Sequence, residues 1–259
     1  MSNITLRILI GSLLFLSLTG LTQEQSGYQD FILLSDLDDT LKITNHSGGV
    51  SRLYRALWST KVFAGMERLY QQISDDSSDF YIVSASPKLI RSRVKRLLRK
   101  RGLNHAKVVL KKIRDGKTYN YKVGAIKHIL SQTTGRLILV GDDTSHDPEV
   151  YDYIMQNYPD RVETIYIRTI VGRELPSSAT PIWSAYDIAI AEHQAGRLTL
   201  EKAASVGSKI IQTKKSKLVH PKFVICPDQF IPLAVAEQED LRTMQEAIYQ
   251  RHQRICDNR

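Results

Sequence analysis

The chain has 259 residues, 42% of them hydrophobic and 24% charged, which is the composition of a globular protein and excludes a largely disordered one. Lysine and arginine (36) outnumber aspartate and glutamate (27), so the formal net charge is +9. This charge favours an anionic partner, such as a lipid surface, a nucleic acid or a phosphorylated substrate, although many small exported proteins are basic without one.

Residues 1–22 have the pattern of a secretory signal peptide. A short positive segment ends at Arg7, and the apolar run 8–21 is shorter than the about 20 residues that cross a bilayer. We therefore expect export, to a bacterial periplasm or out of the cell, with an uncleaved anchor as the alternative. In an exported protein Cys226 and Cys256 can form one disulfide; two free buried thiols are the other interpretation, and a zinc site is not indicated.

Apolar runs of strand length alternate with helical patterns, which is typical of a parallel sheet with crossover helices. The sequence predicts strands at 31–35, 80–84, 107–110, 136–140, 163–168 and 222–226, and helices near 65–74, 87–101, 122–132, 148–157, 184–194 and 236–255. We expect an α/β fold with a Rossmann-like parallel sheet, a core at 28–175 and a helical C-terminal extension at 176–259 packed on it. Residues 42–62 leave room for only a minimal cap, and an open site suits bulky or surface-bound substrates.

The first predicted strand ends in two carboxylates, Asp36 and Asp38, followed by Thr40. Residues i and i+2 of an extended chain point to the same side, so both carboxylates can enter one crevice. One is then suited to attack as a nucleophile while the other transfers a proton. Acidic clusters also follow strands in ordinary loops, so the interpretation depends on what comes later in the chain.

Two further elements are suited to hold a phosphoryl group. The strand that ends at Ser84 leads through Ala85, Ser86 and Pro87 into a helix, and a hydroxyl with free N–H groups at such a junction can bind a phosphate oxygen, although Ser86 alone reads as a helix cap. Lys122 lies between the third and fourth predicted strands, where an ammonium can neutralise a phosphoryl group.

The helix predicted at 87–101 is strongly basic, with seven lysines and arginines in residues 91–101. Its apolar residues are predicted to share the opposite face: Leu89, Ile90, Val94, Leu97 and Leu98. A solvated outer face is the commoner explanation of such charge, and docking on an anionic lipid surface is the alternative. The basic runs lack interleaved aromatic residues, so a nucleic-acid partner is not expected.

The fourth predicted strand runs into a second acidic cluster, which contains Asp142, Asp143, His146 and Asp147. Carboxylates at the carboxyl ends of parallel strands face the same crevice. Magnesium prefers oxygen ligands, usually one or two carboxylates with water and phosphate, and Asp36 and Asp142 meet that need. Asp147 is expected to bind the metal directly or through water, whereas Asp143 fits a supporting or capping role.

These elements, in this order, resemble the haloacid-dehalogenase-like phosphohydrolases over about residues 31–170. Within them the chain is most similar to the phosphatidate phosphatases of the yeast actin-patch type and their bacterial relatives. The narrower resemblance rests on five segments: SDLDDTLK (35–42), AGMERLY (64–70), YIVSASP (81–87), GDDTSHDPEVY (141–151) and IYIRTI (165–170).

The resemblance implies a Mg²⁺-dependent phosphomonoester hydrolase with phosphatidate or another phosphorylated lipid as substrate. It implies that Asp36 attacks phosphorus, that Asp38 transfers the proton, and that Ser84 and Lys122 hold the phosphoryl group. It also implies substrate-side roles for Thr40, Ala85 and His146, the last either at the leaving group or orienting Asp147. The implied metal ligands are Asp36, Asp142, Asp147 and the backbone carbonyl of Asp38.

Two other functions stay open at this point. One is a phosphatase for a soluble ester, such as a nucleotide or a sugar phosphate. The other is a non-catalytic phosphatidate-binding module on the same fold; the presence of Asp38 argues for an enzyme, because such modules lose catalytic carboxylates.

Overall fold

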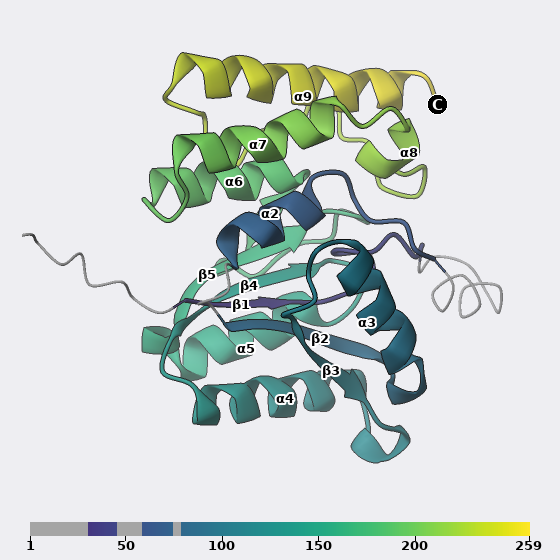
Figure 1. Ribbon diagram of the computed structural model, residues 1–259, viewed down its shortest axis with the longest axis vertical. Helices are drawn as coiled ribbons and strands as arrows, with labels where there is room; N and C mark the ends of the chain where they lie inside the picture. Colours follow the sequence, from purple (N-terminus) through teal and green to yellow (C-terminus); the bar gives the residue numbers. More distant parts are fainter. Residues whose placement is uncertain (1–30, 46–58, 75–78) are drawn as a thin grey trace, which may run out of the picture.

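The computed structural model describes residues 31–45, 59–74 and 79–259. The expected signal segment 1–22 and most of the expected cap at 42–62 lie outside the described residues. The described part contains a six-stranded parallel sheet in the order β3-β2-β1-β4-β5-β6, flanked by helices (Figure 1). This architecture confirms the predicted α/β fold with a Rossmann-like parallel sheet.

Five of the six predicted strands are present, with bounds close to those expected. The strands of the sheet are β1 (Phe31–Ser35), β2 (Asp79–Pro87), β3 (Lys107–Lys111), β4 (Arg136–Asp142), β5 (Val162–Arg168) and β6 (Thr180–Ile182). The strand predicted at 222–226 is wrong: this segment is irregular, lies between Pro221 and Pro227, and its Ile225 N–H bonds to the Ile170 carbonyl. Backbone hydrogen bonding to a neighbouring strand is limited there, because the prolines on both sides lack an N–H donor. The sixth strand of the sheet is instead β6, at a position where no strand is predicted, so the sheet continues beyond residue 175.

Alternation along the strands divides the core into two clusters. On β1, Leu33 faces one cluster, whereas Ile32 and Leu34 face the other. The cluster of Ile32 includes α4 (Thr118–Gln132) and α5 (Asp147–Asn157). The cluster of Leu33 includes α2 (Met66–Ile73), α3 (Arg91–Lys100) and α6 (Ala185–Gln194). Both faces of β1 are therefore buried, as a parallel sheet requires.

Within the C-terminal extension at 176–259, the helices that follow α6 add a layer outside α2 and α6 (Figure 1). It consists of α7 (Leu200–Ile211), α8 (Ser216–Val219) and α9 (Glu239–Asp257), and its buried apolar residues join the cluster of Leu33. Gly207 allows the close packing of α7, because a Cβ there would lie 2.1 Å from the Met244 sulfur and 2.7 Å from the Tyr186 ring. The helix α7 is absent from the sequence prediction.

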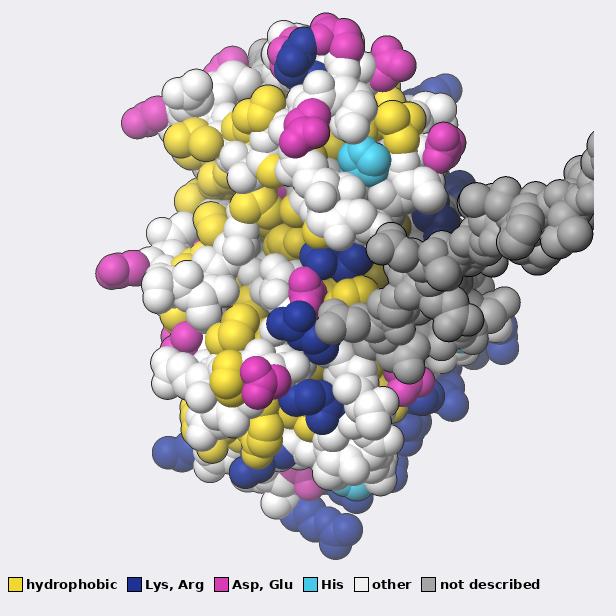
Figure 2. All heavy atoms as spheres, turned by 90° about the vertical axis from the view of Figure 1, so that its left-hand side faces the viewer, with side chains coloured by type: hydrophobic (Ala, Val, Ile, Leu, Met, Phe, Trp, Pro, Cys, Tyr) yellow, Lys and Arg dark blue, Asp and Glu magenta, His cyan; other side chains and the backbone are white. Residues whose placement is uncertain are grey.

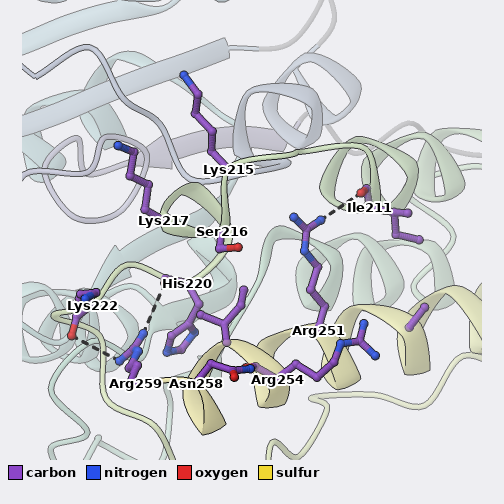
Figure 3. Close-up of a pocket in the computed structure, with 12 residues that line it drawn as sticks. Ile211, Lys215, Ser216, Lys217, His220, Lys222, Arg251, Arg254, Asn258 and Arg259 are labelled. Atoms are coloured by element: carbon purple, nitrogen blue, oxygen red, sulfur yellow. Dashed lines mark hydrogen bonds between the residues drawn. The ribbon is translucent and has the colours of Figure 1, made fainter.

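Cys226 and Cys256 form a disulfide that joins the irregular segment after α8 to the end of α9. A hollow of about 880 Å³ lies beside it, lined by residues of α7, α8, α9 and the segments between them. Figure 3 shows the Arg251 and Arg259 guanidinium groups donating to backbone carbonyls around this hollow, including those of Ile211 and Lys222. These arginines therefore help to hold the extension together.

The face on the left of Figure 1 carries the amino ends of the strands. Figure 2 shows that cationic, acidic and apolar side chains are interspersed on the coloured part of this face. Within the described ranges, no helix is both long and apolar enough to span a bilayer.

A buried histidine pair lies between α9 and the segment after α8. The Nδ1 atoms of His220 and His252 are 2.9 Å apart, and His220 Nε2 lies 3.1 Å from the Ile225 carbonyl. A carbonyl only accepts, so His220 Nε2 donates to it and His220 Nδ1 accepts from His252. Burial, with the charges of Arg259 and Arg168, lowers the pKa of His220 to about 4. Burial, with His220, Arg168 and Arg251, lowers the pKa of His252 to about 3.

This pair should make the fold sensitive to mild acid. In the unfolded chain both histidines have a pKa near 6.5, so the unfolded state takes up protons first as the pH falls. The contribution of the two histidines to the free energy of unfolding is therefore complete above pH 6.5. As the pH falls it decreases, until about pH 4 for His220 and about pH 3 for His252. The loss is at most about 1.4 kcal/mol per pH unit for each histidine. Thermal melts between pH 7.5 and 5 should show this loss as the difference between wild type and a variant of the pair, because the buried carboxylates Asp36, Asp142 and Asp147 have raised pKa values and act in the opposite direction in the same pH range.

The matched comparison uses His252→Phe, which retains an aromatic ring among Phe230 and Tyr249. This variant should melt lower at neutral pH but lose less stability on acidification. His128→Gln changes an exposed histidine outside the pair and is the control for removal of a histidine. Equal pH dependence in His252→Phe and wild type would show that the pair does not titrate as described.

Candidate active site

The two carboxylates that follow β1 have different partners. The Asp36 N–H donates to the Val140 carbonyl (2.9 Å), which aligns the end of β1 with β4. The Asp36 carboxylate accepts a hydrogen bond from Lys122 Nζ at 2.9 Å. The Asp38 carboxylate accepts from Lys42 Nζ (3.2 Å) and from a serine cluster on β2. The arrangement gives the two acids separate environments, as an attacking group and a proton carrier require.

A tight turn after Asp38 sets this arrangement. Asp39 has a left-handed backbone with φ of 60°, a conformation that aspartate tolerates better than most residues. Its carboxylate accepts from the N–H groups of Thr44 (2.8 Å) and Asn45 (2.9 Å), which fixes the chain as it leaves the turn.

The end of β2 supplies two hydroxyls to Asp38. Ser86 Oγ donates to Asp38 at 2.6 Å, and Ser84 Oγ donates to the same oxygen at 3.3 Å. Ser84 Oγ also accepts from the Ser86 N–H at 3.0 Å, which links the two serines. Ala85 lies between them and is half-buried. The predicted cap role of Ser86 is wrong, because β2 continues to Pro87 and the Ser86 hydroxyl is directed to Asp38.

Lys122 joins the two acidic segments. It lies in the second turn of α4, is 2% exposed, and donates to Asp36 and to Asp147. Burial alone would lower the pKa of this ammonium, but the carboxylates of Asp147 and Asp36 outweigh burial and raise it above its ordinary value. Lys122 is therefore charged at neutral pH and bridges the ends of β1 and β4.

Asp142 and Asp147 complete the cluster. Thr40 Oγ1 donates to Asp142 at 2.8 Å, which joins the β1 turn to the end of β4, and the Thr144 N–H donates to the other Asp142 oxygen at 2.8 Å. Burial raises the pKa of Asp142 to about 7, and the Asp36 charge adds to this. Burial likewise raises the pKa values of Asp36 and Asp147, although Lys122 opposes both shifts.

Asp36, Asp142 and Asp147 could hold a divalent cation. Each offers a carboxylate oxygen, and the three oxygens lie within 4.8 Å of one another. When ionised they carry three negative charges against the single positive charge of Lys122, which leaves two charges that a divalent cation would balance. An all-oxygen donor set suits magnesium. The Asp38 carboxylate is not part of this group, and metal binding by its backbone carbonyl stays a prediction.

Other predicted residues occupy positions around this cluster. Asp143 accepts from the N–H groups of Ile170 (2.8 Å), Val171 (3.0 Å) and Gly172 (2.7 Å), so it caps the chain after β5. His146 is exposed, and its ring lies edge-on to the Tyr119 ring, with 6.2 Å between the ring centroids. In the described part of the chain, Asp147 is contacted instead by Lys122 and by the Asp142 N–H.

Three residues of the site are missing from the sequence prediction: Lys42, Ser86 as a partner of Asp38, and Arg168. Arg168 is 2% exposed at the end of β5, donates to the Thr40 carbonyl (3.3 Å) and the Trp183 carbonyl (3.0 Å), and stacks on the Phe63 ring. Burial lowers its pKa to about 10, so it remains charged. Its signal in the sequence is an arginine that directly follows the apolar run 165–167.

The parallel sheet, the paired carboxylates after β1 and the second acidic segment after β4 define an α/β domain with an acidic site at the carboxyl end of its sheet, which is consistent with a haloacid-dehalogenase-like fold. A sequence profile described as "Phosphatidate phosphatase APP1, catalytic domain" matches residues 31–169, more than half of the chain. The chain belongs to this family, as the sequence resemblance predicted.

One curated relative is the yeast (Saccharomyces cerevisiae) protein named Phosphatidate phosphatase APP1. It is 28% identical over 153 residues, which cover 52% of this chain and 25% of the yeast protein. The chain thus spans about a quarter of the length of this relative. No solved structure matches the chain significantly.

The carboxylate cluster predicts that a divalent cation stabilises the fold. Mg²⁺ at about a hundredfold above its Kd should add about 2.7 kcal/mol of stability, because it binds the folded carboxylates and not the unfolded chain. Thermal melts in EDTA and in Mg²⁺ measure this shift. Asp142→Asn should lose most of it and melt higher than wild type in EDTA, because one of the repelling charges is gone.

Glu149→Gln is the matched control. Glu149 lies in the first turn of α5, close in sequence to Asp147, but it is exposed and paired with Arg173. The Glu149→Gln variant should show the same rise in melting temperature on addition of Mg²⁺ as wild type. A shift that is unchanged in Asp142→Asn would place the cation elsewhere.

Proposed function

We propose that this chain is a Mg²⁺-dependent phosphatase that hydrolyses the phosphomonoester of phosphatidate or a similar phosphorylated lipid through an aspartyl-phosphate. The observation that carries the proposal is the pair of acids after β1. Asp36 is bound to Lys122 beside two more carboxylates, whereas Asp38 is bound to two serine hydroxyls. Membership of the phosphatidate phosphatase family supports the same reaction.

Asp36 is the proposed nucleophile. Its carboxylate oxygen attacks phosphorus, and the bond from phosphorus to the lipid oxygen breaks as the new bond forms. Lys122 donates to Asp36 and so holds the attacking carboxylate in one orientation, at a position where its positive charge also lies close to the transferring phosphoryl group. Asp36, Asp142 and Asp147 would hold the Mg²⁺, which would supply further positive charge near the phosphoryl group.

Asp38 is the proposed acid and base. In its protonated form it gives a proton to the departing lipid alkoxide, and as a carboxylate it later takes a proton from the water that hydrolyses the aspartyl-phosphate. Ser84, Ser86 and Lys42 hold the side chain for both steps. Arg168 and Thr40 act through the turn that carries the acids, the first by binding the Thr40 carbonyl and the second by binding Asp142.

Two variants test this division of roles. Asp36→Asn retains the shape of the side chain but removes the attacking charge, so turnover of every phosphomonoester should fall by several orders of magnitude. Asp38→Asn should lower turnover of phosphatidate by about 10²–10⁴-fold. Formation of the phosphoenzyme from p-nitrophenyl phosphate should fall much less in Asp38→Asn, because nitrophenolate leaves without a proton.

Steady-state turnover and the pre-steady-state burst of nitrophenolate separate these effects. Glu149→Gln serves again as the control and should retain normal turnover. Near-normal turnover by Asp36→Asn, with folding verified by its thermal melt, would contradict the mechanism.

We also propose that the chain is exported. The signal-like segment 1–22 supports this, and so does the disulfide between Cys226 and Cys256, because stable disulfides form mainly in oxidising compartments. Protein purified from its native host should begin near residues 20–25 and contain no free thiol, as mass spectrometry with and without reduction can measure. An intact Met1 with two reduced cysteines in a cytosolic fraction would contradict export.

A further inference from the structure

Two large apolar side chains are strongly exposed at one edge of the molecule. Leu89 is 87% exposed in the short turn η1 (Lys88–Ile90), and Ile113 is 97% exposed in the short turn η2 (Ile113–Asp115). They are the two most exposed large hydrophobic residues in the described ranges. The exposure of Leu89 corrects the prediction that it lies on the buried face of the helix, since Ile90, Val94, Leu97 and Leu98 alone are buried there.

Single exposed hydrophobic residues are common, so their placement matters more than their number. η1 follows β2 and η2 follows β3, and these strands pair through Pro87 and Lys111. The two turns therefore leave the sheet side by side at its carboxyl end, and the η2 turn protrudes at the lower right of Figure 1. Leu89 is three residues beyond Ser86, which contacts Asp38, so the apolar residues lie at the rim of the candidate active site.

The surroundings of these two residues are strongly cationic. Residues 88–117 contain thirteen lysines and arginines and a single acid, Asp115, which accepts from the Lys112 N–H. Lys88 adjoins Leu89, and Lys112 and Arg114 adjoin Ile113; all three cations are exposed. Protruding apolar side chains flanked by cations match the boundary of an anionic bilayer, where the apolar groups enter the acyl region and the cations meet the headgroups.

We propose that Leu89, Ile113, Lys88, Lys112 and Arg114 form a lipid-docking rim that seats the active site on the surface of an anionic bilayer. The proposal rests on the proposed function, because a phosphorylated lipid presents its phosphate at that surface. A nucleic acid fits less well, since residues 88–117 contain no Phe, Tyr or Trp to stack on bases. The strong exposure of both side chains on short turns also favours insertion into a fluid surface over binding of a folded protein.

The first test separates docking from catalysis. Co-sedimentation is measured with neutral phosphatidylcholine vesicles and with vesicles that also contain phosphatidylglycerol, which is anionic but is a phosphodiester. Wild type should bind the anionic vesicles and be released by salt. Leu89→Ser/Ile113→Ser should lower the partition coefficient by about tenfold or more. Ile231→Ser/Val235→Ser removes two apolar side chains that are 70% and 62% exposed between α8 and α9, and should bind like wild type.

A second measurement reports insertion directly. The two native cysteines are in the disulfide, so Ile113→Cys gives a single thiol for an environment-sensitive dye. Its emission should shift to the blue on phosphatidylglycerol vesicles, whereas the dye on Val235→Cys should not respond. Undiminished vesicle binding by Leu89→Ser/Ile113→Ser, or a dye at residue 113 that stays in water on bound protein, would overturn the docking rim and favour a protein partner for these residues.

Activity distinguishes failure of this inference from failure of the proposed function. Leu89→Ser/Ile113→Ser should hydrolyse a water-soluble phosphomonoester normally and phosphatidate in anionic vesicles more slowly. Loss of vesicle binding in a protein that hydrolyses no phosphomonoester would support the rim and contradict the phosphatase. Equal phosphatidate turnover by the variant and wild type, with the soluble ester also hydrolysed, would support the phosphatase and contradict the rim.

Discussion

The contact of the Lys122 ammonium with Asp36 and Asp147 is the interaction on which the rest of the site depends. Three carboxylates are buried together at the carboxyl ends of β1 and β4, and burial of like charges is unfavourable unless cations lie among them. Lys122 provides one positive charge and links α4 to both acidic segments. The remaining negative charge is what a divalent cation would balance in the proposed function, and that cation together with Lys122 would attract the anionic phosphate ester.

The turn after β1 places Asp36 and Asp38 in different chemical surroundings. Asp39 has a left-handed backbone, the Thr40 hydroxyl donates a hydrogen bond to Asp142, and the Arg168 guanidinium donates one to the Thr40 carbonyl. Asp36 then contacts Lys122, and Asp38 contacts the serines of β2. The carboxyl end of the sheet also carries the basic turns η1 and η2, so the acidic cluster lies at the same end of the sheet as a strongly cationic segment.

Much of this could be predicted from the sequence because the signals are local. A buried strand that ends in spaced carboxylates predicts Asp36 and Asp38, and the order of apolar runs predicts the parallel sheet. Contacts between distant segments could not be predicted in this way. The bond from Ser86 to Asp38 spans 48 positions and that from Arg168 to Thr40 spans 128, and neither has a spacing signature. Residues 222–226 have the composition of a strand, but the flanking prolines and the disulfide determine the path of the chain there. Leu89 fits the apolar face of a helix, but the helix begins after it, at Arg91.

In the proposed mechanism Asp36 receives the phosphoryl group from the substrate. The most informative measurement mixes Asp38→Asn with p-nitrophenyl phosphate and Mg²⁺, because nitrophenolate leaves without a proton while loss of the base slows hydrolysis of the phosphoenzyme. The reaction is quenched in acid within the first turnover, and the phosphorylated peptide is mapped by mass spectrometry after borohydride reduction, which converts an aspartyl-phosphate to homoserine. We expect modification at Asp36 alone, and none when EDTA replaces Mg²⁺. Release of nitrophenolate with no modified Asp36, or with modification at Asp142 or Asp147, would contradict this mechanism.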